Sequence, residues 1–238
     1  MPVVVIATIA VFCVVHLARS WLFSADTDLE FLILFAFIPV RYDASLLVAG
    51  TLPGGFAADV WTFVTHAFIH ADVTHLGFNT VWFVAFATPL ARRFGTLRFL
   101  AFFVVTAAAG ALAHLITHEG EVQPMIGASA VVSGAMAGAF RFMFQPGGPL
   151  QGWRHASNDN DVPAISLSGM VQDLRIVTVI AVWFGVNLLF GLGSASVIGA
   201  DQAVAWQAHV GGFLAGLLLF GFFDPVPAHP KADGRTEP

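Results

Sequence analysis

Four polar side chains in this sequence are of the types that hydrolyse acyl bonds. Ser129 and His209 offer a hydroxyl and an imidazole base, the minimum for an activated nucleophile. His75 and Asn79, four residues apart, can donate hydrogen bonds to a developing oxyanion. If folding brings the four together, they form a nucleophile and base beside an oxyanion site.

The surrounding sequence is too apolar for a water-soluble domain. Of the 238 residues, 57% are hydrophobic and 11% are charged, whereas an ordinary soluble domain has about 25% charged residues. Mean hydropathy is +0.80. The formal net charge is -5, and no basic stripe is present that could neutralise phosphates, which argues against nucleic acid as a partner. We therefore expect a polytopic protein whose main partner is the lipid bilayer.

Apolar runs close to the roughly 20 residues needed to cross the hydrocarbon core occur six times. They cover residues 2–18, 76–93, 98–117, 126–144, 173–192 and 204–223. We predict an all-α, six-transmembrane-helix domain over residues 1–223 and a disordered cytoplasmic tail over residues 224–238. The long first loop is expected to be partly embedded in the membrane, because its apolar run at 30–39 is too short to cross.

The basic residues predict the orientation of these spans. The first loop carries Arg19 and Arg41, whereas the other eight Lys and Arg residues lie at or beyond the opposite ends of the spans. The positive-inside rule then places both termini in the cytoplasm, and we expect a bacterial inner membrane. The second, fourth and sixth spans begin at the outer face, so the four polar residues named above share one depth.

Small residues spaced by four are the usual device by which membrane helices approach closely. Gly134 and Gly138 provide this spacing in the fourth span, as do Gly212 and Gly216 in the sixth. Taken singly, a serine in a membrane helix is usually a packing residue, and a lone histidine fits an interfacial role. Shared depth, shared direction and small-residue spacing together favour a functional site.

The motifs that contain these residues resemble, over about residues 61–220, the rhomboid family of intramembrane serine proteases. Residues 75–79 match the family's His-x-x-x-Asn, and residues 127–129 match the start of its Gly-x-Ser-Gly. Residues 208–216 match its Ala-His-x-x-Gly-x-x-x-Gly, and residues 93–95 match its Arg-Phe-Gly. The order of the motifs along the chain is also that of the family.

This resemblance implies a dyad in which Ser129 is the nucleophile and His209 is the general base and then the general acid. The Ser129 backbone N–H, Asn79 and His75 would form the oxyanion site, and Gly127 would precede the nucleophile. The implied substrates are transmembrane proteins, cut near the outer membrane boundary. No cofactor is implied, and water must reach Ser129.

Three residues depart from the family pattern. Ala130 follows the nucleophile where glycine is usual, Thr62 stands where a Trp-Arg pair has arginine, and Ser133 replaces an aromatic residue that in some members packs on the catalytic histidine. They motivate a second hypothesis, a catalytically inactive relative that binds membrane helices. A transporter fits less well, because the polar groups lie near one surface and no inverted halves are evident.

Two histidine pairs, His66 with His70 and His114 with His118, have the spacing of helical metal ligands. Neither pair has a nearby set of Cys or carboxylate ligands, so we expect no metal site. The segment 191–204, rich in small residues, precedes the last span and is the expected mobile cap over Ser129. The sequence leaves the natural substrate and the oligomeric state open.

Overall fold

The computed structural model describes residues 1–43, 45, 52–150, 162–192 and 205–227. The secondary structure of this part is helical, apart from an isolated bridge between Phe37 and Met125. Its helices are α1 (Val3–Trp21), α2 (Ala25–Phe35), α3 (Gly55–Thr65), α4 (Val73–Phe94), α5 (Thr96–Thr117), α6 (Ser129–Phe140), α7 (Leu167–Gln172), α8 (Leu174–Leu192) and α9 (Trp206–Phe223). Two 3-10 turns, η1 (Pro39–Tyr42) and η2 (His66–Phe68), lie on either side of α3 in the first loop.

Each of the six predicted spans falls on one of these helices, namely α1, α4, α5, α6, α8 and α9. Among the described residues, α1, α5 and α9 are the three helices long and apolar enough to cross a membrane. The helix α6 is apolar but only 12 residues long, and α4 has polar side chains along its length. The all-helical prediction is thus confirmed, whereas six crossings stay a prediction. Most of the predicted cap (residues 193–204) and most of the predicted tail (residues 228–238) lie outside the described residues.

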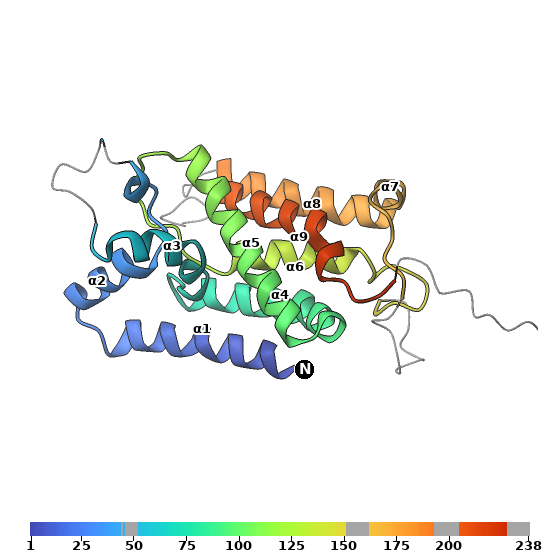
Figure 1. The fold of residues 1–238 in the computed structure, drawn as a ribbon, viewed down its shortest axis with the longest axis horizontal. Helices are drawn as coiled ribbons and strands as arrows, with labels where there is room; N and C mark the ends of the chain where they lie inside the picture. Colours follow the sequence, from blue (N-terminus) through green and yellow to red (C-terminus); the bar gives the residue numbers. More distant parts are fainter. Residues whose placement is uncertain (44, 46–51, 151–161, 193–204, 228–238) are drawn as a thin grey trace, which may run out of the picture.

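Three helices that carry the candidate site begin at the same end of the bundle. Figure 1 shows α4, α6 and α9 starting at the left, where α2 and α3 of the first loop also lie. Asp72 sets the start of α4, because its carboxylate accepts a hydrogen bond of 2.8 Å from the backbone N–H of His75. The shared direction expected from the sequence is therefore present in the fold.

The helices α6 and α9 pack with their backbones in direct contact. A Cβ on Gly212 would collide with the carbonyl of Ala130, and one on Gly216 would collide with the carbonyl of Gly134. Gly134 is itself enclosed, because a Cβ there would lie 2.8 Å from the carbonyl oxygen of Gly212. Only glycine permits this approach, so the small-residue prediction holds for these three positions.

Gly138 has a different neighbour from the one expected. A Cβ at this position would lie 3.3 Å from side-chain atoms of Leu90 in α4 and Phe102 in α5. Gly138 therefore faces α4 and α5 rather than α9. Four residues rotate a helix by about 400°, so Gly138 lies about 40° around α6 from Gly134 and meets these neighbours instead.

An ion pair closes the opposite end of the bundle. Arg93 at the end of α4 binds Asp224, just after α9, through two bonds of 2.7 and 2.8 Å, and both side chains are buried. The same guanidinium lies over the ring of Phe142. A bidentate, buried pair of this kind is a strong geometric tie. The predicted domain boundary at residue 223 stays a prediction. Asp224, the first residue of the predicted tail, packs against the bundle through this ion pair.

We expect Gly212→Ala to destabilise the protein, because the added methyl group would force α6 and α9 apart. Overpacking of this kind costs about 1–3 kcal/mol, and more against rigid backbone. Gly221→Ala is the matched control, since it makes the same change in the same helix at a position with open space. Thermal unfolding in detergent measures both variants, and equal melting temperatures would contradict the proposed role of the contact.

Candidate active site

Ser129 is the first residue of α6, and Gly127 and Ala128 lead into the helix. Gly127 has a φ of +117°, a conformation that side chains other than glycine rarely adopt. Its backbone N–H donates to the carbonyl of His66 at 3.0 Å. The backbone N–H groups in the first turn of a helix have no partner within that helix, so they are available to a developing negative charge beside Ser129.

His75 and Asn79 in α4 lie beside Gly127. A Cβ on Gly127 would lie 2.7 Å from Nε2 of His75 and 3.9 Å from Nδ2 of Asn79. Asn79 is buried, and its Nδ2 also donates to the carbonyl of His75 at 3.0 Å. An amide nitrogen carries two hydrogens, so one remains for a ligand. Both predicted oxyanion donors thus lie beside the residues leading into Ser129.

The hydrogen bonding of His75 indicates which of its ring nitrogens can donate. The backbone N–H of Ala71 donates to Nδ1 at 3.4 Å. A neutral imidazole that accepts at Nδ1 carries its proton on Nε2. The nitrogen nearest Gly127 is therefore the donor, as an oxyanion site requires.

Helix α9 places His209 in the same region. Ala130 in α6 and Ala208, just after the start of α9, both lie against Gly110 in α5. A Cβ on Gly110 would collide with the Ala130 methyl group and would lie 2.9 Å from the Ala208 carbonyl oxygen. Ser129 directly precedes Ala130, and His209 directly follows Ala208.

In the part of the chain that the structure describes, the side chains of Ser129 and His209 do not hydrogen-bond to each other. Nδ1 of His209 instead bonds to Oδ1 of Asn187 in α8. Catalytic contacts are often loose without substrate and tighten when it binds. Sequence reasoning missed Asn187, although an amide inside an otherwise apolar span was a signal that could have identified it.

Two departures from the family pattern are accommodated locally. The Ala130 methyl packs against Gly110, which has no side chain to obstruct it. The Ser133 hydroxyl is buried and donates to the carbonyl of Ser129 at 2.7 Å, one turn earlier in α6. Ala130 therefore packs where α5 has no side chain, and the Ser133 hydroxyl has a hydrogen-bond partner.

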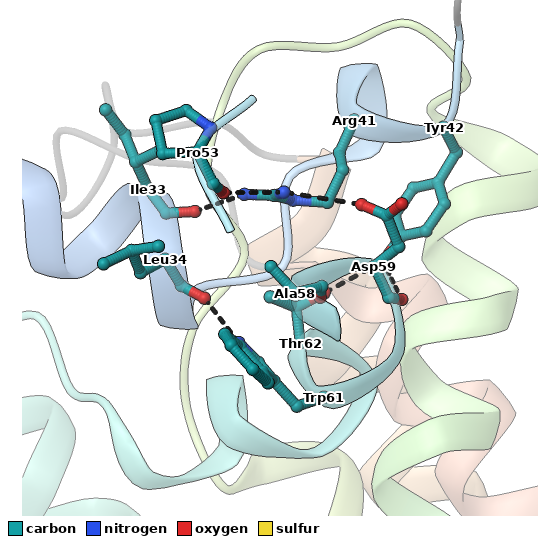
Figure 2. Close-up of polar contacts among 9 residues, drawn as sticks. All are labelled: Ile33, Leu34, Arg41, Tyr42, Pro53, Ala58, Asp59, Trp61 and Thr62. Carbon is teal, nitrogen blue, oxygen red and sulfur yellow. Dashed lines mark hydrogen bonds and ion pairs between the residues drawn. The ribbon is translucent and has the colours of Figure 1, made fainter. Parts of the chain in front are cut away.

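The third departure, Thr62, lies in a first loop organised by Arg41 (Figure 2). The buried guanidinium of Arg41 donates to the carbonyls of Ile33 and Pro53, at 2.5 and 3.1 Å, and pairs with Asp59 at 3.4 Å. The Thr62 hydroxyl hydrogen-bonds to the hydroxyl of Tyr42 at 2.9 Å. The loop thus contains a buried guanidinium even though position 62 is not arginine.

This loop holds the segment that leads into α6. The backbones of Phe37 and Met125 exchange two hydrogen bonds, of 3.1 and 2.8 Å. His66 accepts from the Gly127 N–H, and its own Nδ1 hydrogen-bonds to the Thr62 carbonyl at 2.9 Å. The position of Gly127, and with it the start of α6, therefore depends on the first loop.

Among the described residues, no group of three or more His, Cys, Asp or Glu side chains is placed to hold a metal ion. His114 and His118 stack with ring centroids 4.2 Å apart. His66 and His70 are buried in the first loop, and Phe12 contacts the His70 ring edge-on at 5.1 Å.

The fold and the site define an all-helical integral membrane protein with a serine, two histidines and an amide near one end. The Rhomboid domain model matches residues 57–224, and the chain belongs to the rhomboid family. Rhomboid protease GlpG of Enterobacter sp. (strain 638) is 25% identical over 202 residues, 84% of this chain and 62% of that protein. Rhomboid protease GlpG of Haemophilus influenzae is 33% identical over 51 residues, 21% of this chain and 27% of that protein. The chain thus spans less than two thirds of the length of either relative.

We expect Arg41→Met to destabilise the first loop, because two carbonyls and Asp59 would lose their charged donor. The loss is on the order of 3 kcal/mol for a buried guanidinium with several partners. Arg98→Met, at an exposed position, is the control. Amide hydrogen exchange in α3 and the melting temperature measure the effect, and unchanged exchange in α3 would contradict it.

The stability of the protein should depend on pH. Burial lowers the pKa of His66 to about 4 and that of His70 to about 3, from an ordinary 6.5. The unfolded chain therefore takes up protons that the folded protein excludes, so stability is greatest above pH 6.5 and falls as the pH drops toward 4. Each histidine contributes at most about 1.4 kcal/mol per pH unit in this window.

Melting temperatures between pH 7.5 and 4.5 test this dependence. His70→Phe removes one titrating group and keeps a ring against Phe12, so its melting temperature should fall less steeply with pH. Identical slopes for the variant and the native protein would exclude His70 as a source.

Proposed function

We propose that this protein is an intramembrane serine endopeptidase that hydrolyses peptide bonds of transmembrane substrates near the outer membrane boundary. The observation that carries the proposal is the convergence of His75 Nε2 and Asn79 Nδ2 on Gly127, two residues before Ser129 at the start of α6. Membership of the rhomboid family supports it, as do the printed names of the two relatives, both rhomboid proteases.

In the proposed reaction, the Ser129 hydroxyl oxygen attacks the substrate carbonyl carbon while Nε2 of His209 takes its proton. The oxygen of the tetrahedral intermediate accepts hydrogen bonds from the Ser129 N–H, from Nε2 of His75 and from Nδ2 of Asn79. The C–N bond then breaks, and the leaving amine takes the proton from His209. A water molecule, deprotonated by the same imidazole, releases the acyl group and regenerates Ser129.

The remaining parts of the proposal concern surroundings and partners. We place both termini in the cytoplasm of a bacterial inner membrane, with residues 1–223 as one membrane domain and residues 224–238 as its tail. The partners are the lipid bilayer and transmembrane substrates, without nucleic acid or cofactor. A catalytically inactive, helix-binding protein is the alternative, but the local accommodation of Ala130 and Ser133 removes two of the three observations that motivated it.

Ser129→Ala and His209→Ala should each lower cleavage of a model transmembrane substrate in liposomes by at least about 100-fold, because nucleophile and base act as a unit. A serine-directed fluorophosphonate should label the native chain at Ser129. Ser20→Ala, an exposed serine in α1, is the control and should cleave like the native protein. Equal cleavage by all four proteins would overturn the proposal.

A further inference from the structure

The amide of Asn187 is held in one orientation between two helices. Asn187 is buried in α8, and its Nδ2 donates to the carbonyl of Trp183 at 2.8 Å, one turn earlier. A carbonyl can only accept, so the amide must present its NH₂ group there. The amide oxygen, Oδ1, consequently faces α9, where it meets Nδ1 of His209.

This orientation determines where His209 carries its proton. An amide oxygen can only accept, so Nδ1 of His209 must be the donor. In the neutral ring the remaining nitrogen, Nε2, then has a free lone pair. That is the tautomer a general base needs, because Nε2 must take the proton from the nucleophile.

We infer that Asn187 is a positioning residue that holds His209 in its base-competent tautomer and fixes the plane of its ring. The inference deepens the proposed function and rests on it for its catalytic meaning. An acceptor bonded to the far nitrogen of the base is the role that the third member plays in serine and cysteine protease triads, where it is a carboxylate or an amide. Here the third group comes from α8.

Packing between α8 and α9 supports this role. The ring of Phe213, one turn after His209, stacks on Trp183 at 5.0 Å between centroids and meets Phe184 edge-on at 5.6 Å. Trp183 is also the residue whose carbonyl holds the Asn187 amide. The aromatic contacts therefore restrict rotation of one helix against the other at the level of the hydrogen bond.

Helix α6 supplies no such partner for His209 at position 133. Position 133 faces the core but carries serine instead of an aromatic ring, and its hydroxyl is committed to the Ser129 carbonyl. Ser133 thus supplies neither a stacking surface nor a donor to His209. When His209 takes up a proton at Nε2, its bond to Asn187 becomes charge-assisted and stronger, which stabilises the imidazolium.

The experiment compares variants of the full chain in liposomes with the same model substrate. Asn187→Leu keeps the approximate size of the side chain but removes the acceptor, and should lower kcat by about 10- to 100-fold with KM unchanged. Asn187→Asp keeps an accepting oxygen and should stay within about tenfold of native. Val186→Ala, at a neighbouring exposed position, is the control. Melting temperatures confirm that each variant is folded.

A second readout does not depend on activity. Ring ¹⁵N chemical shifts of labelled histidine, assigned by difference with His209→Asn, report which nitrogen carries the proton. We expect Nδ1–H in the native protein and a shift toward Nε2–H in Asn187→Leu. Native-level kcat in Asn187→Leu, or a native His209 protonated at Nε2, would overturn the inference. If the native protein cleaves nothing, the proposed function fails, and the ¹⁵N shifts still decide whether Asn187 sets the tautomer.

Discussion

The structure depends on the direct backbone contact between α6 and α9. Lipid provides no hydrophobic force that drives two apolar helices together, so close van der Waals packing must do so. Gly212 and Gly216 let α9 rest on the carbonyls of Ala130 and Gly134, and Gly110 leaves room for Ala130 from the side of α5. Because Ser129 and His209 flank this contact in their respective helices, the same glycines bring these two residues into one region.

The first loop provides a second, polar support for the same region. The buried guanidinium of Arg41 binds carbonyls from two separate stretches of the loop. The backbone of Phe37, in the same loop, pairs with that of Met125. His66 then accepts from Gly127, so the entry into α6 is held from outside the bundle. Packing therefore sets the lateral position of α6, and hydrogen bonds from the loop set where that helix begins. The two constraints meet at Ser129.

Two buried asparagines near the site satisfy part of their hydrogen-bonding capacity within their own helices, as a membrane environment favours. Asn79 and Asn187 each donate to a carbonyl one turn earlier, which leaves the rest of the amide to face the site. The two asparagines thus have the same local geometry and opposite uses. Asn79 directs a donor toward Gly127, whereas Asn187 directs an acceptor toward His209.

The sequence by itself determined the helical class and the positions of the main helices, because apolar run length is a local property of the chain. It predicted the grouping of His75, Asn79, Ser129 and His209 from small-residue spacing and family motifs. Tertiary structure decided that Gly138 faces Leu90 rather than α9, that Arg41 organises the loop around Thr62, and that Asn187 bonds to His209. These contacts join residues far apart along the chain, or they depend on how each helix is rotated about its axis relative to its neighbours. Residue spacing within one helix specifies neither the distant partner nor the rotation.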